Sequence, residues 1–217
     1  MPDTGAMNWP DVVAAAIAED PSDLPASDIR ILEATVEVLG ICGEQRLTVD
    51  MVAERAHLSR MTVFRRFGSK QNLIDIAYRR EITKALRDIT GYAEKTDTSV
   101  RRATAVATRM VDSASKIPAL QWIIRAEPQE IVRMWRDLEP PGQELGRAFI
   151  STLLQDSQLQ DPLPAPDADF VADVLIRTVM SLVLVPDPAY QKARPVEVEQ
   201  YIRRVVEHLL GTPRRQH

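Results

Sequence analysis

The chain contains few residues of the kinds that build disulfides, metal clusters or membrane spans. Cys42 is the only cysteine among 217 residues, which excludes an internal disulfide and a cysteine-based metal site. Because Cys42 lies in an apolar run, we interpret it as a small buried thiol, with a redox sensor as the alternative. No run approaches about 18 apolar residues, and the first residues lack the cations of a signal peptide. We therefore expect a cytoplasmic protein.

Glycine is scarce, and the common sequence motifs of enzymes are absent. Eight glycines and few alternating β-branched runs favour helices over sheets. The chain has no G-x-G-x-x-G, P-loop, H-E-x-x-H or G-x-S-x-G motif. Its histidines, His57, His208 and His217, are far apart in the sequence and have unlike neighbours. We therefore expect an all-α protein without a catalytic residue, a metal or a cofactor.

Charge is distributed unevenly along the chain. The net charge is −4, yet eight cations and only three acids lie between Arg46 and Arg80, a local charge of +5 that leaves −9 for the other residues. A basic module on an acidic body is typical of a sequence-selective DNA-binding protein, because the cations attract phosphate locally. The alternative is an ordinary solvated charged face.

The basic segment has the pattern of two short helices joined by a tight turn. Thr48 and Ser59 are favourable N-cap residues, and Gly68 is a typical helix end. Apolar residues at helical spacing predict an inward face on each helix: Val49, Val52, Ala53 and Ala56, then Val63 and Phe67. The second helix projects polar and cationic side chains. This is the pattern of a helix-turn-helix, whose second helix enters the DNA major groove.

Residues 48–73, TVDMVAERAHLSRMTVFRRFGSKQNL, resemble the DNA-binding signature of the tetracycline-repressor (TetR) family of transcription regulators. The resemblance is carried above all by Ala53-Glu54-Arg55-Ala56, Leu58-Ser59, Thr62-Val63, Phe67, Ser69-Lys70 and Leu73. It implies an all-α fold with an N-terminal three-helix helix-turn-helix domain and a C-terminal helical domain for ligand binding and dimerisation. It also implies a repressor that binds a palindromic operator as a dimer and is released by a small molecule.

Two residues depart from the family pattern. His57 stands where the family usually has glycine, in a turn that we expect to need a positive φ, which histidine tolerates better than most residues. Phe64 stands where the family usually has a tyrosine that donates its hydroxyl to a phosphate. A phenyl ring cannot make this contact.

The expected DNA contacts fall into three classes. The first residues of the second helix should meet base edges: Arg60, Met61 and Thr62. Arg65, one turn further, could reach a guanine or a phosphate. Residues at helix starts should meet phosphate: Arg46, Thr48, Ser59 and Lys70. Thr48 and Ser59 could instead serve only as caps, and Arg66 could pair with an acid of its own domain. With Phe64 and Arg66, these residues form the predicted DNA-binding set.

Three segments are expected: an acidic extension at residues 1–26, a DNA-binding domain at 27–94, and a helical effector-binding and dimerisation domain at 95–217. The extension has no Lys or Arg, so we expect it to avoid DNA and either to pack on protein or to be disordered. Residues 8–11 could open a short helix that runs through Ala18. The other helices are expected at residues 28–42, 69–91, 100–116, 119–126, 127–136, 143–155, 169–185 and 196–210, with a stiff proline-rich loop at 161–167.

The last two predicted helices are similar to the pair that forms the four-helix dimer interface of TetR-like proteins. Their apolar residues could equally form the core of a monomer. We favour a homodimer, because two copies on a two-fold axis can read a pseudo-palindromic operator. The residues expected at this interface are Val171, Val174, Leu175, Val198, Ile202, Val205 and Leu209.

Large apolar side chains on separate helices of the C-terminal half are candidates to line a hydrophobic ligand pocket: Met110, Trp122, Met134, Trp135, Phe149 and Met180. For any one of them, a place in the core is the simpler interpretation. Arg177 is a possible polar anchor if it is buried. In the family a small hydrophobic effector bound here releases DNA, which requires the ligand to prefer the DNA-incompetent state. A DNA-binding or adaptor protein without an effector is the alternative.

Overall fold

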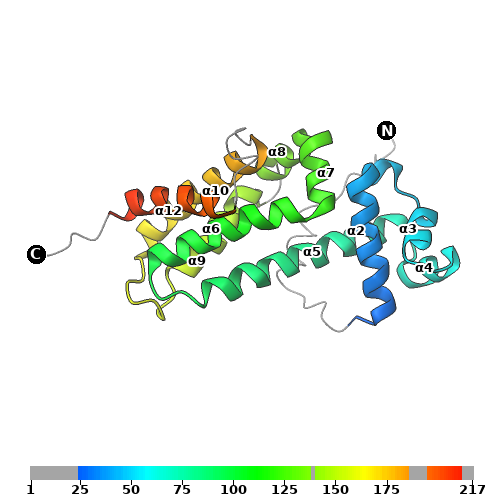
Figure 1. The fold of residues 1–217 in the computed structure, drawn as a ribbon, viewed down its shortest axis with the longest axis horizontal. Coiled ribbons are helices and arrows are strands. Elements are labelled where there is room, and N and C mark those ends of the chain that lie inside the picture. Colours follow the sequence, from blue (N-terminus) through cyan, green and yellow to red (C-terminus); the bar gives the residue numbers. More distant parts are fainter. Residues whose placement is uncertain (1–23, 138–139, 186–194, 212–217) are drawn as a thin grey trace, which may run out of the picture. The chain divides into compact units, whose positions relative to one another are not determined.

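The computed structural model describes residues 24–137, 140–185 and 195–211 (Figure 1). These residues form ten helices and no strand, which confirms the all-α fold class. The helices are α2 (Ala26–Arg46), α3 (Val49–Arg55), α4 (Arg60–Phe67), α5 (Lys70–Ala93), α6 (Ser99–Lys116), α7 (Pro118–Ala126), α8 (Pro128–Asp137), α9 (Gly142–Leu154), α10 (Ala165–Leu184) and α12 (Pro195–Leu210). Over the same ranges, no helix has both the length and the hydrophobicity of a membrane span.

Most helix ends lie within a few residues of their predicted positions, with one correction. The stiff loop predicted at residues 161–167 is wrong in its second half, because α10 already begins at Ala165. Pro166 is tolerated there, since amides in the first turn of a helix have no intrahelical partner. Asp167 adds a carboxylate at the positive end of the helix. The acidic extension and its predicted helix at residues 8–18 lie outside the described residues.

The chain forms two compact units that do not follow a single cut in the sequence. One unit contains the described residues up to Leu86 together with Ser115–Met134. The other contains Arg87–Ala114 and the described residues from Trp135 onward. Helices α5, α6 and α8 therefore contribute to both units. The functional boundary near residue 94 stays a prediction.

The core of the first unit forms where α2 packs against α3 and α7. Its largest fully buried side chains are Ile31, Leu32, Leu39, Leu47, Val52, Leu73 and Ile74. Two glycines of α2 let α7 approach closely. A Cβ atom at Gly40 would lie 2.5 Å from Cβ of Pro118, and one at Gly43 would overlap the indole of Trp122.

Gly43 also interrupts the helical conformation of α2. Its φ of 73° and ψ of 174° are accessible almost only to glycine, and they break the helix near the position that the sequence predicts. The backbone N–H of Leu47 still donates to the carbonyl of Gly43 at 3.2 Å. This short turn leads directly into Thr48, the cap of α3.

The second unit is built around α9 and α10, which pack along one another, with α12 against α10. Its fully buried large side chains are Ile150, Leu154, Leu175, Ile176 and Ile202. Helix α10 is apolar on almost every face, yet the described residues cover only part of it. Phe170 on α10 remains 60% exposed.

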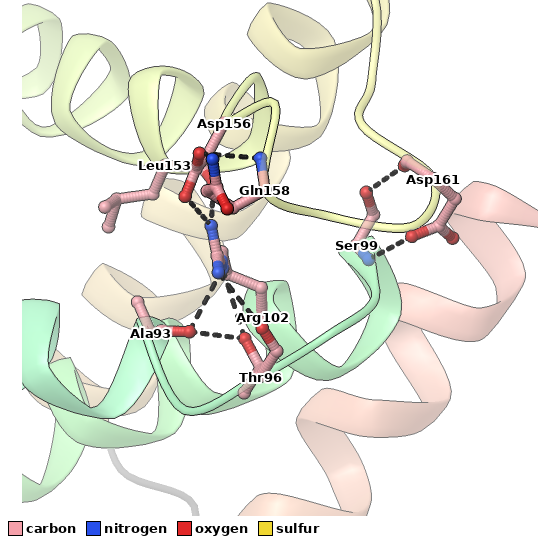
Figure 2. A network of polar contacts seen from close by, with 8 residues as sticks. All are labelled: Ala93, Thr96, Ser99, Arg102, Leu153, Asp156, Gln158 and Asp161. Atoms are coloured by element: carbon pink, nitrogen blue, oxygen red, sulfur yellow. Dashed lines mark hydrogen bonds and ion pairs between the residues drawn. The ribbon is translucent and has the colours of Figure 1, made fainter.

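Arg102 joins three parts of the second unit through its buried guanidinium (Figure 2). It donates to the carbonyls of Ala93, Thr96 and Leu153 at 3.0–3.3 Å, and to the carboxylate of Asp156 at 2.6 Å. These carbonyls lie at helix ends or in connections, where the helices leave acceptors without intrahelical partners, and that of Ala93 also accepts from the N–H of Thr96. The guanidinium thereby fixes the connection from α5 to α6 against the end of α9.

Candidate nucleic-acid interface

Helices α3 and α4 each begin with the predicted side-chain cap. The hydroxyl of Thr48 accepts from the backbone N–H of Met51 at 3.3 Å, and that of Ser59 accepts from Thr62 at 3.1 Å. Ser69 likewise accepts from the N–H of Asn72 at the start of α5. Each capping hydroxyl accepts from a backbone donor in the first turn of its helix, and the N–H of Thr62 also donates to the carbonyl of Ser59 at 2.9 Å. Capping therefore sets the boundaries of the helix-turn-helix.

The turn between α3 and α4 has the backbone conformation that the sequence predicts. His57 has a φ of 55°, and no other non-glycine residue among the described ranges has a positive φ. The N–H of Ala56 donates to Val52 and that of Leu58 donates to Ala53, which closes the turn. Gly68, with a φ of 72°, then ends α4. The strained histidine is held by hydrogen bonds on both sides of it.

The two faces of α4 differ sharply in burial. Val63 is 1% exposed and Phe67 is 7% exposed, so they anchor the helix on the core of the first unit. On the other face, Met61 and Phe64 are 73% and 54% exposed, and Arg65 is also exposed. The buried pair therefore orients α4 so that its other side chains are free to meet a partner.

Several cations of this region pair with acids of the same unit. Arg60 contacts Asp50 at 2.9 Å, and Arg66 contacts Asp28 of α2 at 3.1 Å. The Arg60–Asp50 pair is exposed and contributes little to stability, so phosphate can replace this carboxylate at small cost. The Arg66 pair is less exposed, because the Asp28 side chain is only 14% exposed. The side chain of Arg65 makes no ion pair or hydrogen bond with another described residue. It is therefore the cation of α4 that is most directly available to DNA.

The predicted DNA-binding residues all lie in one short stretch of the first unit, from the end of α2 to the start of α5. Arg46, Thr48 and Ser59 are exposed, and Lys70 is half-buried and donates to the carbonyl of Gln45 at 3.4 Å. The hydroxyls of Thr48 and Ser59 already accept hydrogen bonds as N-caps, which agrees with the alternative that these two residues serve only as caps. Their contact with phosphate stays a prediction.

Sequence reasoning missed the acidic partners of the α4 arginines. A pair with an acid of its own domain was the alternative for Arg66, and the structure shows Asp28 as that acid. The partner, Asp28, is 38 residues away in the sequence, so no local pattern identifies it. Asp50 is closer, but its contact with Arg60 depends on the angle between α3 and α4 rather than on spacing within one helix.

Two ionisable side chains behind the helix-turn-helix have shifted pKa values. Burial raises the pKa of the Glu44 carboxyl, and this outweighs the hydrogen bond with Gln71 that lowers it. Burial also raises the pKa of the Tyr78 hydroxyl, with a further contribution from Glu44 and Glu127. Both shifts disfavour negative charge there. Among the described residues, no group of three His, Cys, Asp or Glu side chains could hold a metal ion.

The predicted ligand residues divide between the two units. Trp122 and Met134 belong to the first, and the other members belong to the second: Met110, Trp135, Phe149, Arg177 and Met180. Within the second unit, Met110, Trp135 and Phe149 are partly buried and pack on its core. Arg177 is exposed and bound to Asp173 at 2.8 Å, so it does not meet the condition of burial. Whether any of these residues binds a ligand stays a prediction.

The predicted dimer residues differ in how far a single chain buries them. Three are fully or almost fully buried in the core of the second unit: Val171, Leu175 and Ile202. Four are half-buried: Val174, Val198, Val205 and Leu209. The half-buried residues, with exposed Phe170 and Tyr201, are the ones that a second copy could still cover.

Comparisons with known proteins agree with this geometry. Residues 31–76 match the family described as bacterial regulatory proteins, tetR family. This range runs from α2 through the helix-turn-helix into the start of α5. No protein of curated function matches the chain in sequence.

Solved structures resemble almost the whole chain. The fatty acid degradation regulator FadR of Bacillus halodurans has a TM-score of 0.59 and 13% identity, covering 90% of this chain and 100% of that one. FadR of Bacillus subtilis, solved with stearoyl-CoA, has a TM-score of 0.54 and 14% identity, covering 82% and 96%. The TetR family repressor AlkX of Dietzia sp. strain DQ12-45-1b, implicated in n-alkane biodegradation, has a TM-score of 0.51 and 19% identity, covering 84% and 95%. At these identities the likeness shows a common fold.

Proposed function

We propose that this chain, which belongs to the TetR family of bacterial regulatory proteins through residues 31–76, is a transcriptional repressor that binds a palindromic operator as a homodimer. Regulators of this family are in general DNA-binding proteins rather than enzymes, and we assign no catalytic residue. A repressor of chromosomal genes would work in the cytoplasm.

One observation carries the proposal: α4 is anchored through Val63 and Phe67 and leaves Met61, Phe64 and Arg65 exposed. Capped starts and a hydrogen-bonded turn hold this face in place. The surrounding stretch carries a charge of +5, which attracts the DNA backbone. A rigid, exposed, cationic helix is what the major groove admits.

Homodimerisation is proposed because one α4 helix reads too few base pairs to define an operator. Two copies related by a two-fold axis would place their α4 helices on half-sites one helical turn, or a multiple of it, apart. The half-buried apolar residues of α10 and α12 are the surface proposed to meet the second copy.

The first test is selection of bound duplexes from a random pool. We expect the purified protein to recover a site with two inverted half-sites. A reporter gene fused to that site would then fall in expression when the chain is present. Recovery of no enriched site would contradict the proposal. A rise in reporter expression would show that the protein activates transcription instead of repressing it.

The dependence of operator binding on salt tests the proposed phosphate contacts. About three phosphates for each protomer predict a slope of roughly −5 when the logarithm of the binding constant is plotted against that of the salt concentration. Removing one cation, as in Arg65→Ala, should make the slope less steep if that cation meets phosphate. A slope near zero for the unaltered protein would contradict the assignment.

A small hydrophobic effector is the second part of the proposal. It is supported by the partly buried Met110, Trp135 and Phe149 beside the core of the second unit, and by the stearoyl-CoA bound to the similar FadR of Bacillus subtilis. Hydrophobic compounds, long-chain acyl-CoA included, should raise the melting temperature and weaken operator binding together. A compound that stabilises the protein without weakening DNA binding is not an effector. If none of the tested compounds both raises the melting temperature and weakens operator binding, the alternative of a regulator without an effector is favoured.

A further inference from the structure

We propose that Met61 and Phe64 read the 5-methyl groups of thymines in the major groove, so that each operator half-site carries thymine at fixed positions. This inference rests on the proposed function and adds the chemistry by which α4 selects its sequence. It also gives Phe64 a contact with base edges instead of phosphate.

The two side chains form an apolar patch on the outward face of α4. They are three residues apart, which makes them neighbours on the surface of a helix. Met61 is 73% exposed and Phe64 is 54% exposed, whereas the anchors Val63 and Phe67 are buried. The patch is therefore separate from the core, and more than half of each side chain is exposed.

Neither side chain can bind phosphate well. Phe64 has no donor or acceptor, and the thioether of Met61 is only a weak acceptor. Among their polar neighbours, the hydroxyls of Ser59 and Thr62 lie 2.9 Å apart and hydrogen-bond to each other, and Arg60 makes an exposed pair with Asp50 that DNA can displace. Between these polar and cationic groups, Met61 and Phe64 present apolar surface to a partner.

The charge around the patch indicates which partner covers it. Arg65 lies four residues after Met61, on the same side of α4, and is exposed. The stretch from Arg46 to Arg80 carries a net charge of +5, which suits a polyanion. Among the four bases, only thymine presents an apolar group, its 5-methyl, at the major-groove edge. An apolar patch framed by cations therefore matches a thymine-containing groove.

Deoxyuridine is the probe that isolates the methyl group. In the operator recovered by selection, each thymine is replaced in turn by deoxyuridine, which removes the methyl and keeps the base pairing. Loss of one buried methyl should weaken binding about fourfold, corresponding to about 0.8 kcal/mol. We expect this loss at one or two thymines of each half-site and no change at the others.

Three alanine variants assign the effect to the patch. Met61→Ala and Phe64→Ala should each weaken binding to the thymine operator and bring the thymine-to-uracil ratio at one sensitive position close to one. Ile41→Ala is the matched control, because Ile41 is also 73% exposed in the same unit but lies outside the helix-turn-helix. It should leave both affinity and ratio unchanged. Because all three side chains are exposed, circular dichroism and melting temperature should stay close to those of the parent.

The outcomes separate this inference from the function on which it rests. If the operator binds tightly but every deoxyuridine duplex binds equally well, the methyl readout is wrong and the repressor proposal stands. If the ratios persist in both alanine variants, other residues read the methyl groups and the assignment to Met61 and Phe64 is overturned. If no duplex is bound at low salt, both proposals fail.

Discussion

Arg102 and Asp156 show how single polar residues shape the second unit. The N–H of Gln158 and the guanidinium of Arg102 both donate to the Asp156 carboxylate, and they hold its pKa below the usual range (Figure 2). The folded chain therefore binds this proton less readily than the unfolded chain does. The stabilisation is complete above the unfolded pKa and is lost as the pH falls toward the folded value.

The resulting prediction concerns the pH dependence of stability. Asp156→Asn cannot titrate, so its free energy of unfolding should fall less between pH 7 and pH 3 than that of the parent. Urea midpoints at the two pH values measure this difference. Asp97→Asn, which alters an exposed pair with Arg101, is the control and should leave most of the pH dependence in place. Equal losses in the parent and in Asp156→Asn would contradict the assignment.

Residues of the candidate site were predictable from sequence where the cause is local. Thr48, Ser59 and Ser69 cap helices because their hydroxyls need only reach an amide three residues ahead. The positive φ of His57 follows from the tight turn it occupies. The partners of Arg60 and Arg66 were not predictable, because an ion pair between helices depends on how the helices pack.

At the scale of elements, α2 and α7 are joined by a contact that requires glycine. The φ of Gly43 excludes most side chains, and the indole of Trp122 occupies the space where a Cβ atom would lie. Gly68 also has a positive φ, of 72°, but nothing lies within 4 Å of its virtual Cβ. A side chain at Gly68 would therefore meet backbone strain alone, whereas one at Gly43 would meet both backbone strain and steric overlap with Trp122.

Alanine at these two glycines should have unequal costs. Gly68→Ala should lower the free energy of unfolding by about 1–2 kcal/mol through backbone strain alone, because a side chain disfavours a φ of 72° with a ψ of −43°. Gly43→Ala should cost roughly 2–4 kcal/mol, because overpacking against Trp122 is added to the strain. In a double-mutant cycle, Trp122→Ala should recover part of the Gly43→Ala cost. Equal costs for the two alanine variants would show that the indole imposes no restraint.

The helices themselves were predicted well, since apolar spacing, caps and proline breaks are properties of a few adjacent turns. The error at the start of α10 has the same local origin. A run of prolines indicates an extended loop, yet Pro166 fits the first turn of a helix. Packing of Ala168 and Val171 into the core of the second unit adds to these local preferences and favours the helix over the loop.

At the scale of the whole molecule, the proposed dimer makes a prediction about α12. Val205 is half-buried in one chain, so a carboxylate there is tolerated in the monomer but would be buried without a partner in a dimer. Val205→Asp should raise the dimer dissociation constant more than tenfold and weaken operator binding with it. Sedimentation at several concentrations measures the first effect.

The control for this prediction lies on the same helix. Arg203 is exposed and pairs with Glu199 one turn earlier, so Arg203→Ala should leave the dimer intact. A Val205→Asp protein that keeps its melting temperature and remains dimeric would exclude this face of α12 from the interface. A dimer that binds the palindromic operator would then have to form through another surface of the chain.

The sequence by itself determined the all-α class, the helix-turn-helix with its caps and turn, and the cationic character of that segment. These follow from interactions within a few residues and from the order of charges along the chain. Tertiary structure alone decided which of the predicted interface residues are buried in a single chain. It also decided the ion pairs of Arg66 and Arg102 with acids 38 and 54 residues away, and the close packing of α7 on Gly40 and Gly43. Such contacts join residues that are distant in sequence, and they exist only once the helices have packed.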